Sequence, residues 1–253
     1  MIAFENVSKR LGNRAVLDGV SYRIDKGEVF FIVGPSGVGK SVTLKHMVRL
    51  LTPDSGRVMV GDENISAATG ENLEKLRERF GYLFQGGALL AWLTVVENVA
   101  LPLREKTDMS DADIMAKVMD LLKMVGLEND AEKLPDEISG GMRKRAGLAR
   151  ALVRSPEIVL YDEPTSGLDP VTSRTIDSLI QKMRDDLGIT SVVVTHDLHS
   201  ALSIGTRIAM LHGGKIVEMA TPKDFVNSPE PEVRAFLESQ FITKEGVWER
   251  NIK

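Results

Sequence analysis

The sequence predicts an α/β fold, in which a core sheet is interrupted by a helical insertion and preceded by a small antiparallel β region. Val29–Val33 and Ile158–Tyr161 are continuous apolar runs, which are typical of strands buried on both faces. Between them, residues from about 86 to 155 show helical periodicity instead. We therefore expect two halves of an α/β core with a helical segment inserted between them.

The first 65 residues predict short strands and one helix. Apolar runs bounded by turn residues indicate strands at Ile2–Phe4, Ala15–Leu17, Val20–Ile24 and Val29–Val33, with turns at Gly12-Asn13 and Lys26-Gly27. A helix is expected from Lys40 to about Leu51, where Thr52-Pro53-Asp54 ends it. A small hairpin should follow, with strands at Arg57–Val60 and Glu63–Ile65.

The clearest helix lies in the insertion. Ser110 with Asp113 has the pattern of an N-cap and a first-turn acid. The apolar residues that follow recur on one helical face: Ile114, Val118, Leu121, Leu122 and Val125. A second helix is expected from about Gly141 to Arg154, before Pro156.

The second half of the core continues the α/β pattern. Its predicted elements are a helix at Val171–Leu187, strands at Ser191–Thr195, Arg207–Leu211 and Lys215–Glu218, and a short helix at Glu232–Glu238. His212-Gly213-Gly214, between the last two strands, predicts a closing hairpin.

The 253 residues have the composition of an ordinary globular protein, 43% hydrophobic and 27% charged. The net charge of −4 implies no large basic surface, which argues against nucleic-acid binding. The lack of cysteine excludes thiolate metal sites and a cysteine nucleophile. No apolar run is long enough to cross a bilayer and no secretory signal is found. We therefore expect a cytoplasmic protein that reaches a membrane only through a partner.

A glycine-rich segment between a predicted strand and a predicted helix fits the pattern GxxxxGK[ST]. Its residues, with the one that follows, are Gly34, Pro35, Ser36, Gly37, Val38, Gly39, Lys40, Ser41 and Val42. Such glycines let backbone N–H groups turn toward a phosphate at the positive end of a helix. Lys40 could reach the β- and γ-phosphates of a nucleotide, and the Ser41 hydroxyl could coordinate Mg²⁺. A plain glycine-rich turn is the alternative, which this placement disfavours.

Two acids follow the second buried run. Asp162 and Glu163 should emerge at the carboxyl end of a strand, where open α/β sheets bind ligands. Asp162 would hold Mg²⁺, and Glu163 would polarise the water that attacks the γ-phosphate. A solvated Asp-Glu turn is the alternative, which the phosphate loop makes unfavourable.

A second helix start has the features of an anion site. Ser139, Gly140 and Gly141 open the helix that precedes the acidic strand. The alternative is an ordinary capped helix with a solvated basic face made of Arg143, Lys144 and Arg150. For these three basic residues we favour the solvated face.

Together, these motifs resemble those of the nucleotide-binding subunits of ABC transporters, over essentially the whole chain. Gln85 matches the Q-loop of that family, Ser139–Met142 its LSGGQ signature, Ser166–Asp169 its D-loop and His196 its switch histidine. The resemblance implies a P-loop NTPase of the ABC type, with a RecA-like core, an N-terminal antiparallel β subdomain and an inserted α-helical subdomain. The expected division is 1–85 and 156–221 for the ATP-binding core, 86–155 for the helical subdomain and 222–253 for a C-terminal tail.

The resemblance also implies a head-to-tail dimer that binds two molecules of Mg-ATP in its interface. Each ATP would contact the phosphate loop of one copy and Ser139, Gly140 and Gly141 of the other, with Asp169 and Leu11 also at the site. The implied catalytic residues are Glu163, His196, Gln85 and Lys40, and the implied ligands of Mg²⁺ are Ser41, Gln85 and Asp162.

Two positions depart from the family pattern. The family usually stacks an aromatic residue on adenine, whereas this position holds Leu11, beside Arg10 and Arg14. Selectivity for adenine is therefore in doubt. Met142 replaces the signature glutamine, as in several importer branches, and we expect activity to survive the change.

Three functional classes compete. A soluble ABC ATPase would normally carry two cassettes, a zinc insertion or a long coiled coil, and the sequence shows none of these. A binding module without hydrolysis would lack the acid at Glu163. The ATPase subunit of a transporter remains, either for phospholipid or for a small solute such as an amino acid, a quaternary amine or a peptide.

The segment Phe84–Glu105 favours phospholipid. It resembles the Q-loop region of the ATPase in the Mla and related Mce-associated phospholipid transporters, as do Gly12–Arg14 and Pro229–Leu237. This resemblance implies a separate transmembrane permease, a periplasmic lipid-binding MCE-type protein and a small cytoplasmic accessory subunit, with the chain at the cytoplasmic side of the inner membrane. The apolar residues beside Gln85 form either core of the helical subdomain or a groove for a permease helix: Leu89, Leu90, Trp92 and Leu93.

Overall fold

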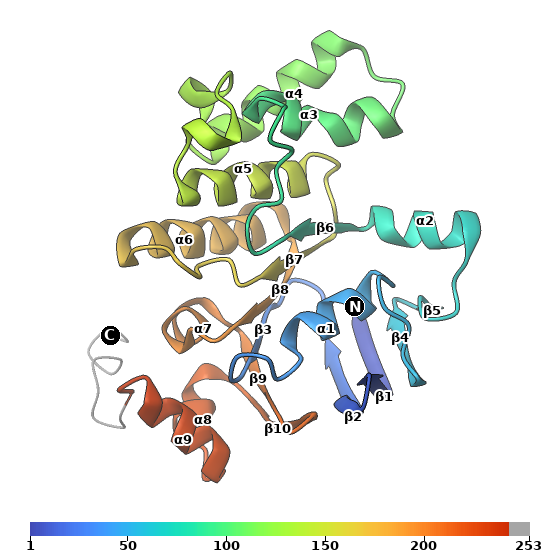
Figure 1. The fold of residues 1–253 in the computed structure, drawn as a ribbon, viewed down its shortest axis with the longest axis vertical. Coiled ribbons are helices and arrows are strands. Elements are labelled where there is room, and N and C mark those ends of the chain that lie inside the picture. The colour runs from blue at the N-terminus through green and yellow to red at the C-terminus, as the bar shows by residue number, and fades with distance from the viewer. Residues whose placement is uncertain (243–253) are drawn as a thin grey trace. The chain divides into compact units, whose positions relative to one another are not determined.

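The computed structural model describes residues 1–242, and they adopt the predicted α/β fold. The chain divides into two compact units. The first contains Met1–Leu76 together with the chain from Val192 onward, and the second contains Arg77–Ser191. Figure 1 shows the first unit in blue and in orange to red, and the second in green to yellow. The residue boundaries expected for the subdomains stay a prediction, and residues 243–253 of the expected tail lie outside the described part.

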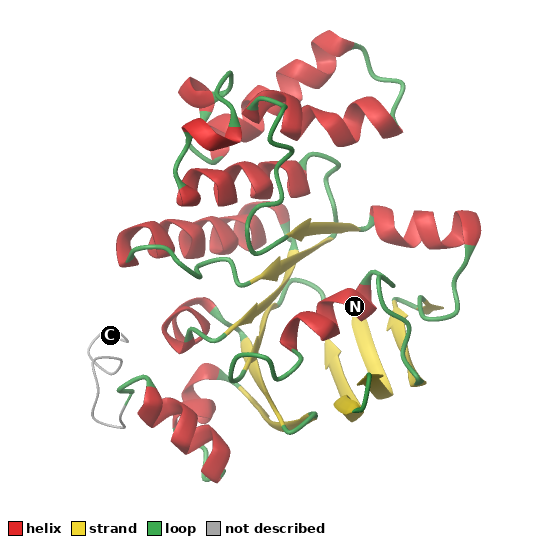
Figure 2. Ribbon diagram, viewed as in Figure 1, coloured by secondary structure: helices red, strands yellow, loops and turns green. Residues whose placement is uncertain are grey.

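An antiparallel sheet opens the first unit (Figure 2). Its strand order is β2-β1-β4-β5, formed by Arg14–Ile24, Ile2–Leu11, Ser55–Val60 and Glu63–Asn64. The predicted hairpin of β4 and β5 is confirmed by the antiparallel pair of Met59 with Asn64. The prediction of two strands within β2 is wrong. Gly19, with a φ of 64°, interrupts the regular pairing without ending the strand, and its N–H donates to Ser8 Oγ at 2.9 Å.

The core strands of the first unit are rich in apolar residues. Their order is β10-β9-β3-β8, formed by Lys215–Ala220, Arg207–His212, Val29–Val33 and Thr190–Thr195, of which β8 begins in the second unit. All five residues of β3 are buried, as a continuous apolar run predicts. β3 runs parallel to β9, and β9 and β10 form the predicted closing hairpin.

Four helices accompany these strands among the described residues of the first unit: α1 (Lys40–Met47), α7 (Leu198–Ile204), α8 (Pro222–Val226) and α9 (Pro231–Ser239). α1 ends before the expected Leu51, because Arg49 adopts a left-handed φ of 51°. The N–H groups of Leu50 and Leu51 then turn back to the carbonyl oxygen of Lys45, at 2.8 and 3.2 Å. α2 (Gly70–Glu78) joins the first unit to the second.

The second unit combines a parallel strand pair with a group of helices. β6 (Phe80–Leu83) pairs with β7 (Ile158–Asp162). Helices α3 (Val95–Lys106), α4 (Asp111–Met124) and α5 (Gly140–Leu152) pack against one another, and α5 also contacts β6 and α6 (Pro170–Leu187). Two short 3₁₀ turns, Glu128–Asp130 and Pro135–Glu137, precede α5. α4 confirms the helix predicted from apolar spacing, and Ser110 is its N-cap.

α3 is not among the helices predicted from the sequence. Thr94 and Glu97 form a capping box at its start, which is a signal that the sequence contains. The apolar run around it and Pro102 inside the helix obscured that signal. Among residues 1–242, no helix is long and apolar enough to cross a membrane.

Candidate functional site

The phosphate loop connects β3 to α1 in the first unit, and two of its glycines have no room for a side chain. Gly34 has a φ of 149°, and a Cβ at this residue would overlap the carbonyl oxygen of Leu211. Gly39 has a φ of 115°, and its Cβ would lie 2.6 Å from Val16 Cγ1. These backbone conformations and close contacts require glycine, so the loop is tightly specified by its surroundings.

Lys40 is held inside this loop. Its side chain is only 6% exposed, and Nζ donates to the carbonyl oxygens of Gly34 at 2.9 Å and Pro35 at 3.1 Å. α1 begins at this lysine with no side-chain cap and no acidic residue in its first turn. A buried positive charge at an uncapped helix N-terminus suits a bound phosphate.

The hairpin between β1 and β2 lies beside the phosphate loop. Leu11 pairs with Arg14 at its tip, and the Leu11 side chain is 45% exposed. Arg14 Nη2 donates to the carbonyl oxygen of Gly37 at 3.1 Å, which ties the hairpin to the loop. Leu11 thus offers an exposed apolar side chain on the hairpin next to the loop, and its contact with adenine stays a prediction.

His196 follows β8, a neighbour of β3 in the sheet, and its side chain is exposed. Gln240, which the sequence analysis did not identify, fixes the backbone here. Its Nε2 donates to the carbonyl oxygen of His196 at 2.6 Å, and its Oε1 accepts from the N–H of Leu198 at 2.9 Å. No motif marks this glutamine, since its role depends on where the chain after α9 folds back.

In the second unit, β6 and β7 bring three candidates to one edge. The strands are parallel and Leu83 pairs with Tyr161, so Asp162 at the end of β7, Glu163 after it and Gln85 after β6 all lie at the carboxyl ends of neighbouring strands. Asp162 and Glu163 are nearly buried, and Gln85 is exposed. This arrangement is the one that the sequence predicts for the acids, and it argues against a solvated turn.

Tyr82 lies beside the acid that would hold Mg²⁺. Its hydroxyl donates a long hydrogen bond, 3.5 Å, to Asp162 Oδ2. Burial raises the pKa of Tyr82, and the negative charge of Asp162 raises it further. The tyrosine therefore stays a neutral donor toward the carboxylate at physiological pH.

Glu163 adopts an uncommon backbone conformation. Its φ is 50°, in the left-handed region, which costs a residue with a Cβ about 1 to 2 kcal/mol. Its carbonyl oxygen accepts from the N–H of Ser166 at 3.3 Å and closes a tight turn. Strained backbone that the surroundings hold in place is common at functional sites.

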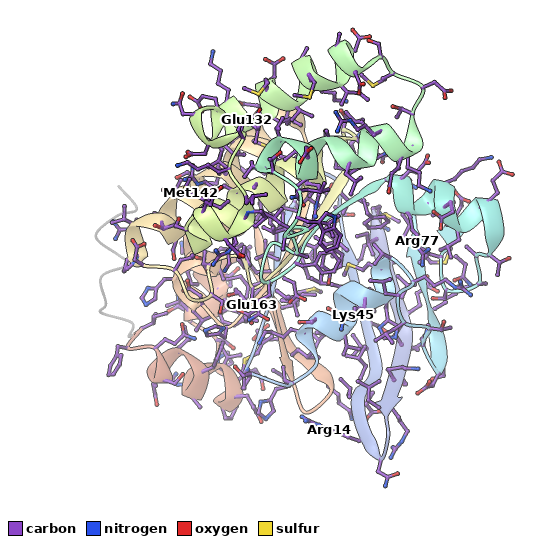
Figure 3. The ribbon with its side chains drawn as sticks, turned by 45° about the horizontal axis from the view of Figure 1, so that its top comes forward. Arg14, Lys45, Arg77, Glu132, Met142 and Glu163 are labelled. Carbon is purple, nitrogen blue, oxygen red and sulfur yellow. The ribbon has the colours of Figure 1, made fainter. Side chains whose placement is uncertain are left out.

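α5 begins at the predicted anion site. Ser139 is exposed, and its Oγ accepts from the N–H of Met142 at 3.2 Å (Figure 3 labels Met142). Gly141 is buried, and a Cβ on it would overlap Thr172 Cγ2, whereas a Cβ on Gly140 would meet nothing closer than 3.9 Å. The second glycine is therefore required by packing against α6.

The prediction of a solvated basic face on α5 is wrong. Arg143 Nη1 donates to the carbonyl oxygens of Pro135 at 3.2 Å and Ile138 at 2.9 Å. The other two bond to other loops: Lys144 Nζ to the carbonyls of Glu163 and Ser166, and Arg150 to those of Gly87 and Ala88. The face was misjudged because helical spacing alone does not show which loops cover it.

Asp169 caps α6. Its Oδ1 accepts from the N–H groups of Val171 and Thr172, both at 3.0 Å, and its Oδ2 accepts from Thr172 Oγ1 at 2.5 Å. The hydrogen bond from the Thr172 hydroxyl is the main reason why the pKa of Asp169 is lowered. The carboxylate thus accepts hydrogen bonds from its own helix, and the contact of Asp169 with the nucleotide stays a prediction.

The segment after Gln85 is also fixed from within the second unit. Asn98 is fully buried; its Oδ1 accepts from the N–H of Leu90 at 2.7 Å, and its Nδ2 donates to the carbonyls of Leu90, Leu93 and Thr94 at 2.9 to 3.0 Å. Trp92, inside this segment, is 74% exposed. Leu89, Leu90 and Leu93 are partly buried, so they serve the helical core in part while Trp92 does not.

The predicted residues thus form two groups, each within one unit. The first unit holds Leu11, the phosphate loop from Gly34 to Val42, and His196. The second unit holds Gln85, Ser139, Gly140, Gly141, Asp162, Glu163 and Asp169. Among the described residues, no cluster of three or more His, Asp or Glu side chains could hold a metal ion by itself.

Comparison with known proteins gives consistent matches. A family model described as "ABC transporter" matches residues 17–166. The probable ribonucleotide transport ATP-binding protein mkl of Mycobacterium leprae is 40% identical over 98% of this chain and 72% of its own length. The intermembrane phospholipid transport system ATP-binding protein MlaF of Escherichia coli K12 is 38% identical over 94% of this chain and 88% of its own length.

Two further matches concern import and structure. The methionine import ATP-binding protein MetN of Clostridium tetani is 41% identical over 100% of this chain and 79% of its own length. Among solved structures, the ATP-binding cassette MJ0796, a dimer in a post-hydrolysis state bound to ADP and Pi, superposes with a TM-score of 0.81. That match has 36% identity and covers 88% of this chain and 99% of MJ0796.

Proposed function

The chain belongs to the ABC transporter family and is an ATPase subunit, and on that premise we propose that it drives phospholipid transport between the inner and outer membranes of a Gram-negative-type envelope. ATP hydrolysis follows from the family. The assignment of individual residues to steps, the cargo and the partners form the proposal.

The phosphate loop and the turn after β7 would carry out hydrolysis. Lys40 and the α1 N-terminus would bind the β- and γ-phosphates, and Glu163 would accept a proton from the attacking water as the bond to the γ-phosphorus breaks. His196 would contact the γ-phosphate from the end of β8. Each of these groups can be tested by a substitution that leaves the fold unchanged.

The oxygen donors predicted for Mg²⁺ fit that ion. Ser41, Gln85 and Asp162 supply a hydroxyl, an amide carbonyl and a carboxylate, which are hard ligands. Mg²⁺ is usually bound by one or two carboxylates with substrate phosphates, which agrees with the lack of a larger acidic cluster among the described residues. When bound, the ion would neutralise charge on the phosphates.

A second copy of the chain would complete each site. Ser139 is exposed at the start of α5, and its hydroxyl oxygen already faces the N–H groups of that helix. The dimeric MJ0796 cassette supports a pair of copies as the working form. We propose that Ser139, Gly140 and Gly141 contact the ATP of the partner copy.

The phospholipid cargo depends on Phe84–Glu105. This segment resembles that of the Mla-type ATPases, and the identity with MlaF extends over 88% of that relative. The exposure of Trp92 is the single observation that carries the docking role. This large aromatic side chain is 74% exposed on a loop that hydrogen bonds from Asn98 hold in place, and such a side chain suits contact with a protein partner. The proposed partners are a separate permease, a periplasmic MCE-type protein and a small accessory subunit, with this chain at the cytoplasmic face of the inner membrane.

Import of a small solute is the second candidate. It is supported by the 41% identity to the methionine importer subunit MetN over the full length of this chain. The two candidates share the ATP site, so only the cargo distinguishes them.

Glu163→Gln tests hydrolysis. The amide keeps the shape of the side chain but cannot accept the proton, so we expect ATP affinity to stay within about threefold and turnover to fall at least 100-fold. ATP binding by calorimetry and phosphate release on the same preparation measure both. Undiminished turnover would contradict the role given to Glu163.

The same variant tests the cargo in cells. A strain that carries only Glu163→Gln should show an altered distribution of phospholipid at its outer membrane. Normal lipid distribution together with defective methionine uptake would favour import instead. The docking role is tested by Trp92→Ala, which should weaken binding to the permease at least tenfold, whereas Leu187→Ala, another exposed apolar side chain, should not.

A further inference from the structure

Lys144 is a buried cation in the second turn of α5. Only 5% of it is exposed, and it lies on the face that packs toward the turn after β7. Burial lowers the pKa of Lys144, and the negative charge of Glu163 partly offsets this effect. Removing an ammonium group from water costs free energy unless the group is hydrogen-bonded in the protein. The groups that accept its hydrogen bonds therefore show which part of the structure it stabilises.

Two hydrogen bonds of Lys144 go to one turn. Nζ donates to the carbonyl oxygen of Ser166 at 2.6 Å and to that of Glu163 at 3.2 Å. The same Glu163 carbonyl accepts from the N–H of Ser166, and Leu168 N–H donates to the carbonyl of Thr165 at 3.2 Å. Lys144 therefore binds both ends of the turn that begins at Glu163.

This turn is the one whose backbone is strained. Glu163 keeps a φ of 50° although its side chain favours another region, and a different φ would redirect its carboxylate. Charge-assisted hydrogen bonds to two carbonyls are strong enough to favour the strained conformation. Without them, the turn could relax and the carboxylate would leave its position at the end of β7.

We propose that Lys144 is a positioning residue for ATP hydrolysis, which holds the Glu163–Ser166 turn so that the Glu163 carboxylate points at the attacking water. The inference rests on the proposed role of Glu163. Lys144 lies on the helix that begins at Ser139, which is proposed to contact the ATP of the partner copy. It therefore links that contact to Glu163, the proposed general base of the same chain.

The alternative is that Lys144 only stabilises α5. Arg145, the next residue, gives a matched comparison. Its Nη1 donates to the carbonyl oxygens of Val125 at 2.5 Å and Gly126 at 2.9 Å, which lie after α4 and outside the Glu163–Ser166 turn. Arg145 is thus a cation on the same helix that bonds two carbonyls of a different loop.

The experiment compares Lys144→Met with Arg145→Met. For Lys144→Met we expect kcat of ATP hydrolysis to fall at least tenfold, while the Kd of ATP, measured by calorimetry, stays within about threefold. Arg145→Met should keep kcat within about twofold, even where its Tm falls. Lys144→Arg, which restores a donor to the same carbonyls, should recover at least part of the lost kcat.

Three results would overturn the proposal: a kcat of Lys144→Met within twofold of the wild type, an equal loss of kcat in Arg145→Met, or no recovery in Lys144→Arg. Where Lys144→Met does not fold, Lys144→Gln replaces it under the same criteria. In the Glu163→Gln background, Lys144→Met should cause no further loss of turnover. Full turnover in the single variant Glu163→Gln would reject the proposed role of Glu163. If Glu163→Gln loses turnover but Lys144→Met keeps a normal kcat, only the positioning role of Lys144 is rejected.

Discussion

The N-termini of α1 and α5 are both predicted to bind the phosphates of ATP, yet they differ in structure. α1 begins after Gly39 without a side-chain cap, and Lys40 is buried inside the loop that precedes it. α5 begins with Ser139, whose exposed hydroxyl caps the first turn. Arg143, in the first turn of α5, donates through Nη1 to the carbonyl oxygens of Pro135 and Ile138, so its positive charge is bonded to the loop before the helix.

This difference suggests a division of roles. The α1 start would be an enclosed anion site with its own positive charge, which suits strong binding of ATP by one chain. The α5 start offers N–H groups, a hydroxyl and an arginine that is already bonded to two carbonyls, which suits recognition of a phosphate already bound by another copy. A weak second contact lets the dimer form and separate with each ATP, whereas a strong one would hold it closed.

The largest expected effect is at Gly34. Gly34→Ala places a methyl group against the carbonyl oxygen of Leu211, so we expect ATP affinity to fall at least 100-fold and the free energy of unfolding to fall by about 3 kcal/mol. Gly37→Ala is the control, because its Cβ meets nothing within 4 Å. Because the φ of this residue is 74°, Gly37→Ala should lower the free energy of unfolding by about 1 kcal/mol. Calorimetry and urea unfolding measure both, and equal losses in the two variants would contradict the enclosed site.

An intermediate effect is expected at Gly141. Gly141→Ala forces a methyl group onto Thr172 Cγ2, which should lower turnover about tenfold and stability by about 1 to 3 kcal/mol. Gly140→Ala should leave stability unchanged or slightly raised, since its Cβ has room. Adding Thr172→Ser to Gly141→Ala removes the clashing methyl group and should restore stability. Failure of that rescue would show that packing against α6 is not the constraint.

The smallest effect concerns pH and Asp169. Its pKa is lowered in the folded protein, so the ionised carboxylate stabilises the fold above the unfolded value of 3.8, and this contribution is lost as pH falls through the lower folded pKa. Asp169→Asn keeps a cap but no charge, and should lower Tm by roughly 2 °C at pH 7. The difference in Tm between the two proteins should shrink below about pH 4. A difference that does not change with pH would reject the role of the charge.

Sequence patterns predicted those elements whose conformation depends mainly on residues close in sequence. The buried run Val29–Val33 is β3, and the spacing from Ile114 to Leu122 is the buried face of α4. The phosphate loop and the acids after β7 were predicted because their chemistry requires fixed residue types at fixed spacing. These features were identified from the sequence alone.

Features that depend on distant contacts were not predicted. Lys144 was assigned to a solvated face, because its carbonyl partners in the Glu163–Ser166 turn are brought to it only by packing of α5. Gln240 was missed for the same reason, since the chain after α9 returns to His196. Ala15–Leu17 and Val20–Ile24 were predicted as separate strands, but the pairing of β2 with β1 continues past Gly19.

The left-handed backbone at Glu163 has a consequence for how this sequence could change over time. A glycine there would adopt the same φ without strain, so Glu163→Gly should make the isolated subunit more stable. Selection for stability alone would therefore remove the glutamate. A lineage that no longer needs ATP turnover should lose this residue early, and a chain that keeps it records continued selection for hydrolysis.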